Sequence, residues 1–338
     1  MRLCRLVPLM LASIALAQSF TAQNSTSTEN LRGLSAVSPS VIWASGTHGT
    51  YLRTLDGGTT WTAGQVAGAE ALDFRDVQAF SADEAYLLAA GPGEQSRIYN
   101  TVDAGKTWTL QFTNADPKGF FDCMAFWDRT HGIALGDPVD GEFALITTED
   151  GEHWHGLPEA VGPRALAQEG AFAASGTCLV AQGADNVWFV TGGFAARVFR
   201  SSNRGNTWSA ADVPLVKDNA SSGAFSLAFD GEGRAVIGGG DYQQAERKPT
   251  LAYSDDRGIT WQGLPFVQQS YFSAVAIDPA NRRHLLAVGS AHAAYADDLG
   301  SGAWKAYWDL NLNAAAFVGP GEAIAVGPQG KIVRFTLP

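Results

Sequence analysis

The octapeptide at residues 54–61, Thr-Leu-Asp-Gly-Gly-Thr-Thr-Trp, decides the fold because it returns along the whole chain. The pattern Ser/Thr-x-Asp-x-Gly-x-x-Trp is complete again at residues 101–108 (TVDAGKTW) and 254–261 (SDDRGITW). Two copies are altered: residues 147–154 (TTEDGEHW) have Glu149 in the Asp place, and residues 201–208 (SSNRGNTW) have Asn203 there. A sixth copy, residues 296–304 (ADDLGSGAW), has lost the hydroxyl and gained one residue. Such recurrence indicates an architecture built from one repeated unit.

The residue types of this box are those of a tight hairpin. The Asp carboxylate and the Ser/Thr hydroxyl accept hydrogen bonds from turn N–H groups that have no ladder partner. Gly permits a left-handed backbone, and Trp opens the returning strand and buries its ring. Because the box recurs in nearly every unit, we assign it a folding role in preference to catalysis or calcium binding. The residues concerned are Asp56, Trp61, Asp103, Trp108, Glu149, Trp154, Asn203, Trp208, Asp256 and Trp261.

Each box lies late in a unit of four expected strands. The first strands align at residues 32–37, 75–80, 121–126, 176–181, 224–229, 272–277 and 312–317. Four strands per unit, at a spacing of roughly 40–50 residues, are typical of propeller blades. The sequence therefore predicts an all-β protein, a seven-bladed β-propeller of four-stranded blades with Asp-box hairpins. The last unit stops after its third strand, so we expect residues 20–28 to supply its outer strand and close the ring.

The N-terminus is typical of an export signal. Arg2 and Arg5 precede an apolar run over residues 6–17 that ends in Ala-Leu-Ala. This run is too short to span a bilayer and is followed by no lipid-modifiable Cys. We expect residues 1–17 to be a signal peptide cleaved near Ala17, and residues 18–338 to be a single propeller in the periplasm or outside the cell. No later segment is apolar enough for stable membrane insertion.

Composition narrows the classes of partner. The net charge is −11, and cleavage would remove two arginines and no acids. Nucleic acid needs a basic footprint, so we expect no nucleic-acid partner. His48 and His292 occupy equivalent loops, but no third metal ligand is visible, and no cofactor motif occurs. We therefore expect no metal or cofactor, and a monomer.

Candidate site residues lie in the loops of one face, which we call the top face. It carries the loops between second and third strands and the connections between blades, opposite the box turns. Three segments depart from the short-loop pattern: residues 136–141, residues 240–249 and the long connector at about residues 156–175. Loops carry function more often than the elements they join. The candidates are Lys118, Phe120, Asp137, Asp140, Arg164, Glu169, Asp241 and Tyr242.

These side chains allow three interpretations. Asp137, Asp140 and Asp241 stand beside glycines, where carboxylates commonly cap turns. Together with the neighbouring Arg and Tyr residues they could form a binding surface for a peptide or a sugar. A carboxylate pair could also perform general acid–base or glycosidic chemistry.

The boxes and the spacing resemble those of the bacterial neuraminidase repeat (Asp-box) propellers. A single seven-bladed unit with an export signal is most similar to the photosystem II assembly and stability factor family and its bacterial relatives. That resemblance implies a non-catalytic propeller that holds a client protein on an arginine-lined face, whereas the arginines of this chain are scattered. Sialidases also resemble it in their boxes, but their Arg-Ile-Pro motif is missing, since Arg32 and Arg75 precede Gly33 and Asp76.

Two functional hypotheses follow. The first is an exported, non-catalytic propeller that binds a protein or glycan through its top-face loops, for example as an assembly or scaffolding factor. The alternative is a glycan-cleaving hydrolase with an unfamiliar carboxylate pair.

Cys123 and Cys178 remain after cleavage and occupy the same register of the first strand in adjacent units. An export compartment permits a disulfide, which requires Cα atoms within about 7 Å. We expect the innermost strands to diverge instead, and the two thiols to be buried and reduced, with a disulfide as the alternative.

Overall fold

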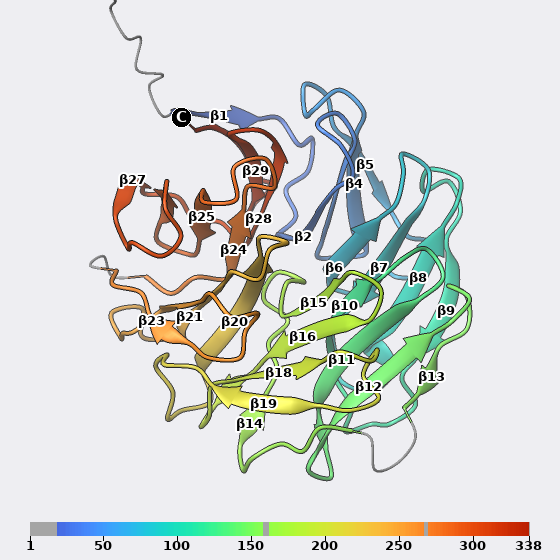
Figure 1. The fold of residues 1–338 in the computed structure, drawn as a ribbon. Coiled ribbons are helices and arrows are strands. Elements are labelled where there is room, and N and C mark those ends of the chain that lie inside the picture. The colour runs from blue at the N-terminus through green and yellow to red at the C-terminus, as the bar shows by residue number, and fades with distance from the viewer. Residues whose placement is uncertain (1–18, 158–161, 267–269, 338) are drawn as a thin grey trace, which may run out of the picture.

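The computed structural model describes residues 19–157, 162–266 and 270–337, which form seven antiparallel sheets in a ring (Figure 1). The predicted seven-bladed β-propeller is thereby confirmed. Residues 1–17, the expected export signal, lie outside the described part of the chain. Within the described ranges, no helix is long and apolar enough to cross a membrane.

The blades are numbered along the chain, each from its innermost strand outward. Blade 1 is β2 (Leu31–Ala36), β3 (Ile42–Gly46), β4 (Thr50–Thr54) and β5 (Thr62–Gln65). Blade 2 is β6 (Phe74–Ala79), β7 (Ala85–Ala89), β8 (Arg97–Thr101) and β9 (Thr109–Thr113). Blade 3 is β10 (Phe121–Phe126), β11 (Gly132–Val139), β12 (Glu142–Thr148) and β13 (His155–Gly156). Blade 4 is β15 (Leu179–Gln182), β16 (Asn186–Val190), β18 (Arg197–Ser201) and β19 (Ser209–Asp212).

The remaining blades follow the same order. Blade 5 is β20 (Ser222–Phe229), β21 (Ala235–Asp241), β22 (Leu251–Ser254) and β23 (Gln262–Gly263). Two short strands, β14 (Glu169–Gly170) and β17 (Gly192–Gly193), extend its sheet on the β20 side. Blade 6 is β24 (Ala274–Ile277), β25 (Leu285–Val288), β26 (Ala293–Ala296) and β27 (Trp304–Trp308). Blade 7 is β28 (Ala314–Gly319), β29 (Glu322–Val326), β30 (Ile332–Thr336) and the N-terminal β1 (Ser19–Gln23).

The core lies between neighbouring blades. Second strands such as β3 and β25 are buried along their whole length, because they face an adjacent blade on both sides. Outer strands such as β5 are largely exposed. Burial of apolar side chains between sheets contributes roughly 25 cal/mol per Å² and is the main source of stability for such a fold.

The boxes act as the sequence analysis expects. In the first box the Thr54 hydroxyl accepts from the N–H of Gly58 at 2.8 Å, and Asp56 accepts from the N–H of Thr60 at 2.9 Å. Gly58 adopts a φ of +88°, in the left-handed region that favours glycine. Trp61 is buried against the core of blades 7 and 1. Asp103, Asn203 and Asp256 accept equivalent bonds from the N–H of Thr107, Thr207 and Thr260.

One box residue was assigned wrongly. In blade 3 the acceptor is Asp150 and not Glu149: Asp150 accepts from the N–H of Glu152 and of His153 at 2.8 Å. The hydroxyl comes from Thr148, which accepts from the N–H of Gly151 at 2.9 Å. This turn is one residue shorter than the others, so aligning it on Thr147 displaced the carboxylate position.

The ring closes through the N-terminal strand, as predicted. Strand β1 pairs antiparallel with β30, from Ser19 opposite Thr336 to Gln23 opposite Ile332. In Figure 1 the blue β1 lies beside the red C-terminal strands of blade 7. Both ends of the chain therefore share one sheet.

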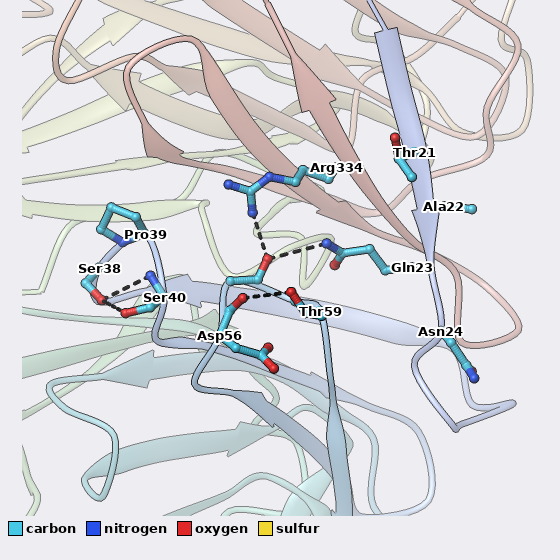
Figure 2. Close-up of a pocket in the computed structure, with 12 residues that line it drawn as sticks. Thr21, Ala22, Gln23, Asn24, Ser38, Pro39, Ser40, Asp56, Thr59 and Arg334 are labelled. Atoms are coloured by element: carbon cyan, nitrogen blue, oxygen red, sulfur yellow. Dashed lines mark hydrogen bonds between the residues drawn. The ribbon is translucent and has the colours of Figure 1, made fainter.

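Side chains lock this closure onto blade 1 (Figure 2). Gln23 accepts from the indole N–H of Trp61 at 3.0 Å and donates to the carbonyl of Gly57 at 3.4 Å. Arg334 donates to the same carbonyl at 2.7 Å. A hollow of about 850 Å³ lies between β1 and the first box, and these contacts cross it. The polar groups of this hollow thus serve the closure of the ring.

The prediction of two reduced thiols was wrong. Cys123 and Cys178 form a disulfide, with Cα atoms 6.2 Å apart. The expectation assumed that innermost strands diverge, but β10 and the segment that leads into β15 approach each other beside the channel. Both cysteines are buried, as expected. The bridge joins blades 3 and 4 and closes the loop that contains the long connector.

Candidate functional site

A repeated backbone irregularity aims four side chains into the mouth of the central channel. The innermost strands of blades 1, 2, 3 and 5 each shift register by one residue near their start. A β-bulge leaves one residue unpaired and turns its side chain away from the ladder. The four skipped residues are Arg32, Arg75, Asp122 and Phe225.

All four bulge residues line one cavity of about 530 Å³ on the top face, which we call the channel-mouth pocket. Its other walls come from the start of blade 3, the long connector, and the top loops of blades 5 to 7. These lining residues are Phe120, Asp137, Ala171, Phe172, Ala173, Ala174, Tyr242, Tyr271, Ser273 and Asn313. The pocket thus combines two guanidinium groups, two carboxyl groups and five aromatic rings.

The aromatic rings form a continuous wall. The rings of Phe172 and Phe225 lie 4.6 Å apart, edge to face. Phe172 also lies 6.3 Å from Tyr242, and Phe225 lies 5.8 Å from Tyr271. Tyr242 keeps 48% of its surface exposed and stands at the rim. Edge-to-face rings at these distances form a rigid apolar surface suited to a flat or branched apolar group.

The two arginines play different parts. Arg75 donates from Nε to Asp73 at 2.6 Å and from an amino group to the carbonyl of Ala173 at 2.9 Å, so it fixes the connector. The buried Nε of Arg32 has no hydrogen-bond partner in the described ranges. Burial lowers the pKa of Arg32, and the charge of Arg75 lowers it further. In the described part of the chain, Arg32 therefore has a free Nε in the pocket, while the charge of Asp73 stabilises its guanidinium.

The carboxyl groups of the pocket are held toward their neutral form. Asp122 is 1% exposed, and its Oδ2 has no hydrogen-bond partner among residues that the structure describes. Burial raises the pKa of Asp122 well above its usual range, and the nearby charge of Asp137 raises it further. Burial also raises the pKa of Asp137, although its Oδ1 accepts from the N–H of Ala171 at 2.8 Å. A desolvated carboxyl that stays protonated is a hydrogen-bond donor.

A second hollow of about 690 Å³ adjoins the pocket and shares Asp137, Ala171 and Phe172 with it. It runs toward the outer rim between blades 3 and 5. Leu166 and Phe194, which are 53% and 49% exposed, line this hollow. We call the two hollows together the top-face groove.

The structure brings together some of the predicted site residues and separates others. Phe120, Asp137 and Tyr242 line the channel-mouth pocket. Lys118 lines the outer hollow, and its Nζ lies 3.1 Å from the Oδ1 of Asp140, both side chains being exposed. Arg164 points into solvent, 3.6 Å from Glu142.

Two predicted residues have structural partners. Glu169 is buried in an ion pair with Arg197 and accepts from the hydroxyl of Thr191. Asp241 accepts from Asn219, Ser221 and Arg247, and these bonds outweigh its burial and lower its pKa to about 2. For Asp241, the hydrogen bonds therefore support the interpretation that the carboxylate caps a turn.

The sequence analysis missed Arg32, Arg75, Asp122, Phe225 and Tyr271 as site residues. A partial signal existed: three of them, Arg32, Arg75 and Asp122, are charged residues at the first or second position of an expected first strand. These residues could be recognised as site residues only if the β-bulges were known, and the period-two alternation of a strand sequence does not reveal a bulge.

No group of three or more His, Cys, Asp or Glu side chains suited to a metal occurs within residues 19–157, 162–266 and 270–337. His48 pairs with Glu29, its Nδ1 lying 2.6 Å from the carboxylate.

Stability should fall as the pH rises from about 5 to about 8. Burial raises the pKa of Asp76 to about 7 and raises those of Asp122 and Asp137. The folded protein binds these protons more tightly than the unfolded chain, so their contribution is complete below about pH 4 and is lost through the folded pKa values. For Asp76 alone the shift corresponds to about 4 kcal/mol. Thermal unfolding at both pH values measures the loss, and Asp76→Asn should flatten the dependence.

The box carboxylates act in the opposite direction at lower pH. Hydrogen bonds from Thr60 and from Thr107 lower the pKa of Asp56 and of Asp103 to about 2. Their contribution is present above about pH 4 and is lost between pH 4 and 2. The two effects together place maximum stability near pH 4–5. A melting temperature that increases from pH 5 to pH 8 would contradict this account.

Comparison with known proteins agrees with this architecture. Residues 252–262 match the BNR/Asp-box repeat, and no curated protein matches the chain. The structure is similar to that of YCF48 bound to D1 peptide, with a TM-score of 0.64 at 16% identity over 94% of this chain and 97% of that one. It is also similar to YCF48 from Cyanidioschyzon merolae, with a TM-score of 0.64 at 18% identity over 94% and 98%. The expected resemblance to Asp-box propellers of the photosystem II assembly factor type is confirmed, and at these identities the likeness concerns the fold.

Proposed function

We propose that this protein is an exported, non-catalytic propeller that binds a protein partner through its top face, in the role of an assembly or scaffolding factor. The observation that carries the proposal is the channel-mouth pocket, where a guanidinium with an Nε unpartnered among the described residues and a buried carboxyl group stand against an aromatic wall. The box carboxylates are engaged in their own turns, and Asp241 and Glu169 are engaged in structural bonds. The solved relative bound to D1 peptide shows that a propeller of this fold can hold a peptide.

Three features support export and a monomer. The basic start and apolar run before Ala17 are typical of a cleaved signal. The disulfide between Cys123 and Cys178 is of a kind that persists in oxidising compartments. Strand β1 pairs with β30 of the same chain, so that blade 7 is completed without a second molecule. Fractionation of expressing cells, followed by mass measurement of the mature chain, tests cleavage after Ala17.

The test of binding compares two exposed apolar residues on opposite faces. Tyr242 stands at the rim of the pocket, and Val102, which is 71% exposed, lies in a box turn. Purified protein is applied to a peptide array and a glycan array. We expect peptide binding that Tyr242→Glu weakens at least tenfold and that Val102→Glu leaves unchanged. Binding to glycans alone, or equal loss in both variants, would refute the proposal.

One observation favours the alternative of a hydrolase: Asp122 and Asp137 share the pocket and interact electrostatically. Chromogenic glycosides test it directly. We expect no turnover above that of an Asp122→Asn, Asp137→Asn double variant, because burial raises the pKa of both carboxyl groups and so disfavours the ionised form that a base or nucleophile requires.

A further inference from the structure

We propose that the channel-mouth pocket recognises a peptide carboxylate: Arg32 binds the carboxylate, Asp122 donates a hydrogen bond to it, and the aromatic wall receives the adjoining apolar side chain. This inference rests on the proposed function and names the chemistry of the ligand at the same site. It is carried by two buried polar atoms of the pocket that lack partners.

The first of these atoms is the Nε of Arg32, which is buried without a partner in the part of the chain described. A buried donor that lacks a hydrogen-bond partner destabilises the unliganded protein, and it does so more when it is charged. Arg75, beside it, is already bonded to Asp73 and Ala173. A ligand carboxylate would satisfy Arg32 with a charge-assisted bond, which a guanidinium forms better than any other side chain.

The second atom is the Oδ2 of Asp122, also buried and unpartnered within the described residues. An ionised Asp122 would repel a carboxylate. Burial raises the pKa of Asp122 and the charge of Asp137 raises it further, while the charge of Arg75 and a hydrogen bond from the N–H of Ala173 lower it. The raised pKa favours the protonated form, which can donate a hydrogen bond. The lining of the pocket thus includes both a cation and a carboxyl group suited to donate. The other charged groups that face it are Arg75, which is paired with Asp73, and Asp137, which accepts from Ala171.

The surroundings favour a carboxylate that belongs to a chain over a free small acid. The pocket continues into the outer hollow across Phe172, so a ligand can extend from the channel toward the rim. Exposed Leu166 and Phe194 lie along that path. The aromatic wall from Tyr271 to Tyr242 is placed to receive the side chain next to the carboxylate. The carboxylate could come from the C-terminus of a chain or from an Asp or Glu side chain.

The probes are three short peptides whose affinities are measured by calorimetry on the full-length mature protein. The first is N-acetyl-Gly-Leu-Phe with a free C-terminal carboxylate, and the second is its C-terminal amide. The third carries an Asp before Phe and a C-terminal amide. We expect the free acid to bind at least tenfold more tightly than the amide. Tight binding of the first peptide alone would assign the carboxylate to the C-terminus, tight binding of the third alone would assign it to a side chain, and tight binding of both would show that the pocket accepts either; all three support recognition of a carboxylate.

Four variants assign the roles. Arg32→Ala should weaken binding of the free acid at least tenfold, while Arg164→Ala, an exposed arginine on the same face outside the pocket, should not change it. Asp122→Asn keeps a neutral donor and should stay within threefold of wild type, whereas Asp122→Ala should lose about tenfold. If Asp122 instead paired with a ligand cation, Asp122→Asn would abolish binding, and if it repelled the ligand, Asp122→Asn would strengthen binding.

The outcomes separate this inference from the proposed function. Equal affinity for all three peptides, with binding still sensitive to Tyr242→Glu, would overturn recognition of a carboxylate and leave the proposal of a peptide-binding top face intact. Binding of glucuronate in the absence of any peptide binding would overturn both. Circular dichroism of each variant before calorimetry ensures that only folded protein is compared.

Discussion

Removal of residues 19–23 is expected to lower the free energy of unfolding by roughly 3–5 kcal/mol, at about 0.5–1.5 kcal/mol for each hydrogen bond lost. The deletion takes away the five register pairs between β1 and β30. It also removes Gln23, which joins Trp61 to Gly57 across the seam. Blade 7 would be left with three strands and an unpaired edge. Chemical denaturation measures the change, and the edge should also make the truncated protein prone to association.

A point variant and a peptide serve as controls for this deletion. Gln23→Ala keeps the strand ladder and removes only the bridge, so its cost should be about 1 kcal/mol. A synthetic peptide of residues 18–30 added to the truncated protein should restore stability in proportion to its concentration, because it binds only the folded ring. A truncated protein that unfolds at the wild-type denaturant concentration would show that closure does not depend on β1.

Loss of the disulfide should have an effect of similar size. The bridge spans 55 residues between Cys123 and Cys178. The chain-entropy relation gives about 4 kcal/mol for a closed loop of this length. The double variant Cys123→Ala, Cys178→Ala should therefore unfold at a markedly lower denaturant concentration. Reduced wild-type protein should behave like the double variant, which separates loss of the bridge from loss of sulfur packing.

The bridge itself is checked by alkylation in denaturant without reductant, followed by mass spectrometry. Protein purified from an oxidising compartment should take up no alkyl group, and two after reduction. Uptake of two alkyl groups before reduction would show that both thiols are free, as the sequence analysis expected.

The fold could be predicted from the sequence because the box is a local signal. The hydroxyl, carboxylate, Gly and Trp of residues 54–61 act within one turn, so their spacing can be recognised without knowledge of any distant contact. The same locality explains the error at Glu149. A turn shortened by one residue changes which carboxylate faces the N–H groups, and both Glu149 and Asp150 are acidic.

Contacts between blades could not be predicted in this way. The 6.2 Å approach of Cys123 and Cys178 depends on how closely two innermost strands meet at the channel, which no period in the sequence encodes. The site shows the same limit. Asp137 and Tyr242 could be predicted as site residues because they lie in expected loops. Arg32 and Asp122 reach the pocket through β-bulges, in strands whose sequences are typical of the core.

Pairing of β1 with β30 also determines when folding can finish. Ser19 is synthesised long before its partner Thr336, which lies more than 300 residues later in the chain. Until β30 is made, β1 has no partner in its own sheet, and the ring stays open at blade 7. Contacts so distant in sequence form slowly, and unpaired edges invite association with other chains meanwhile. The molecule is consequently most vulnerable to aggregation just before β30 is synthesised, and a chaperone that shielded the open edge during that interval would raise the yield of folded protein without altering its final stability.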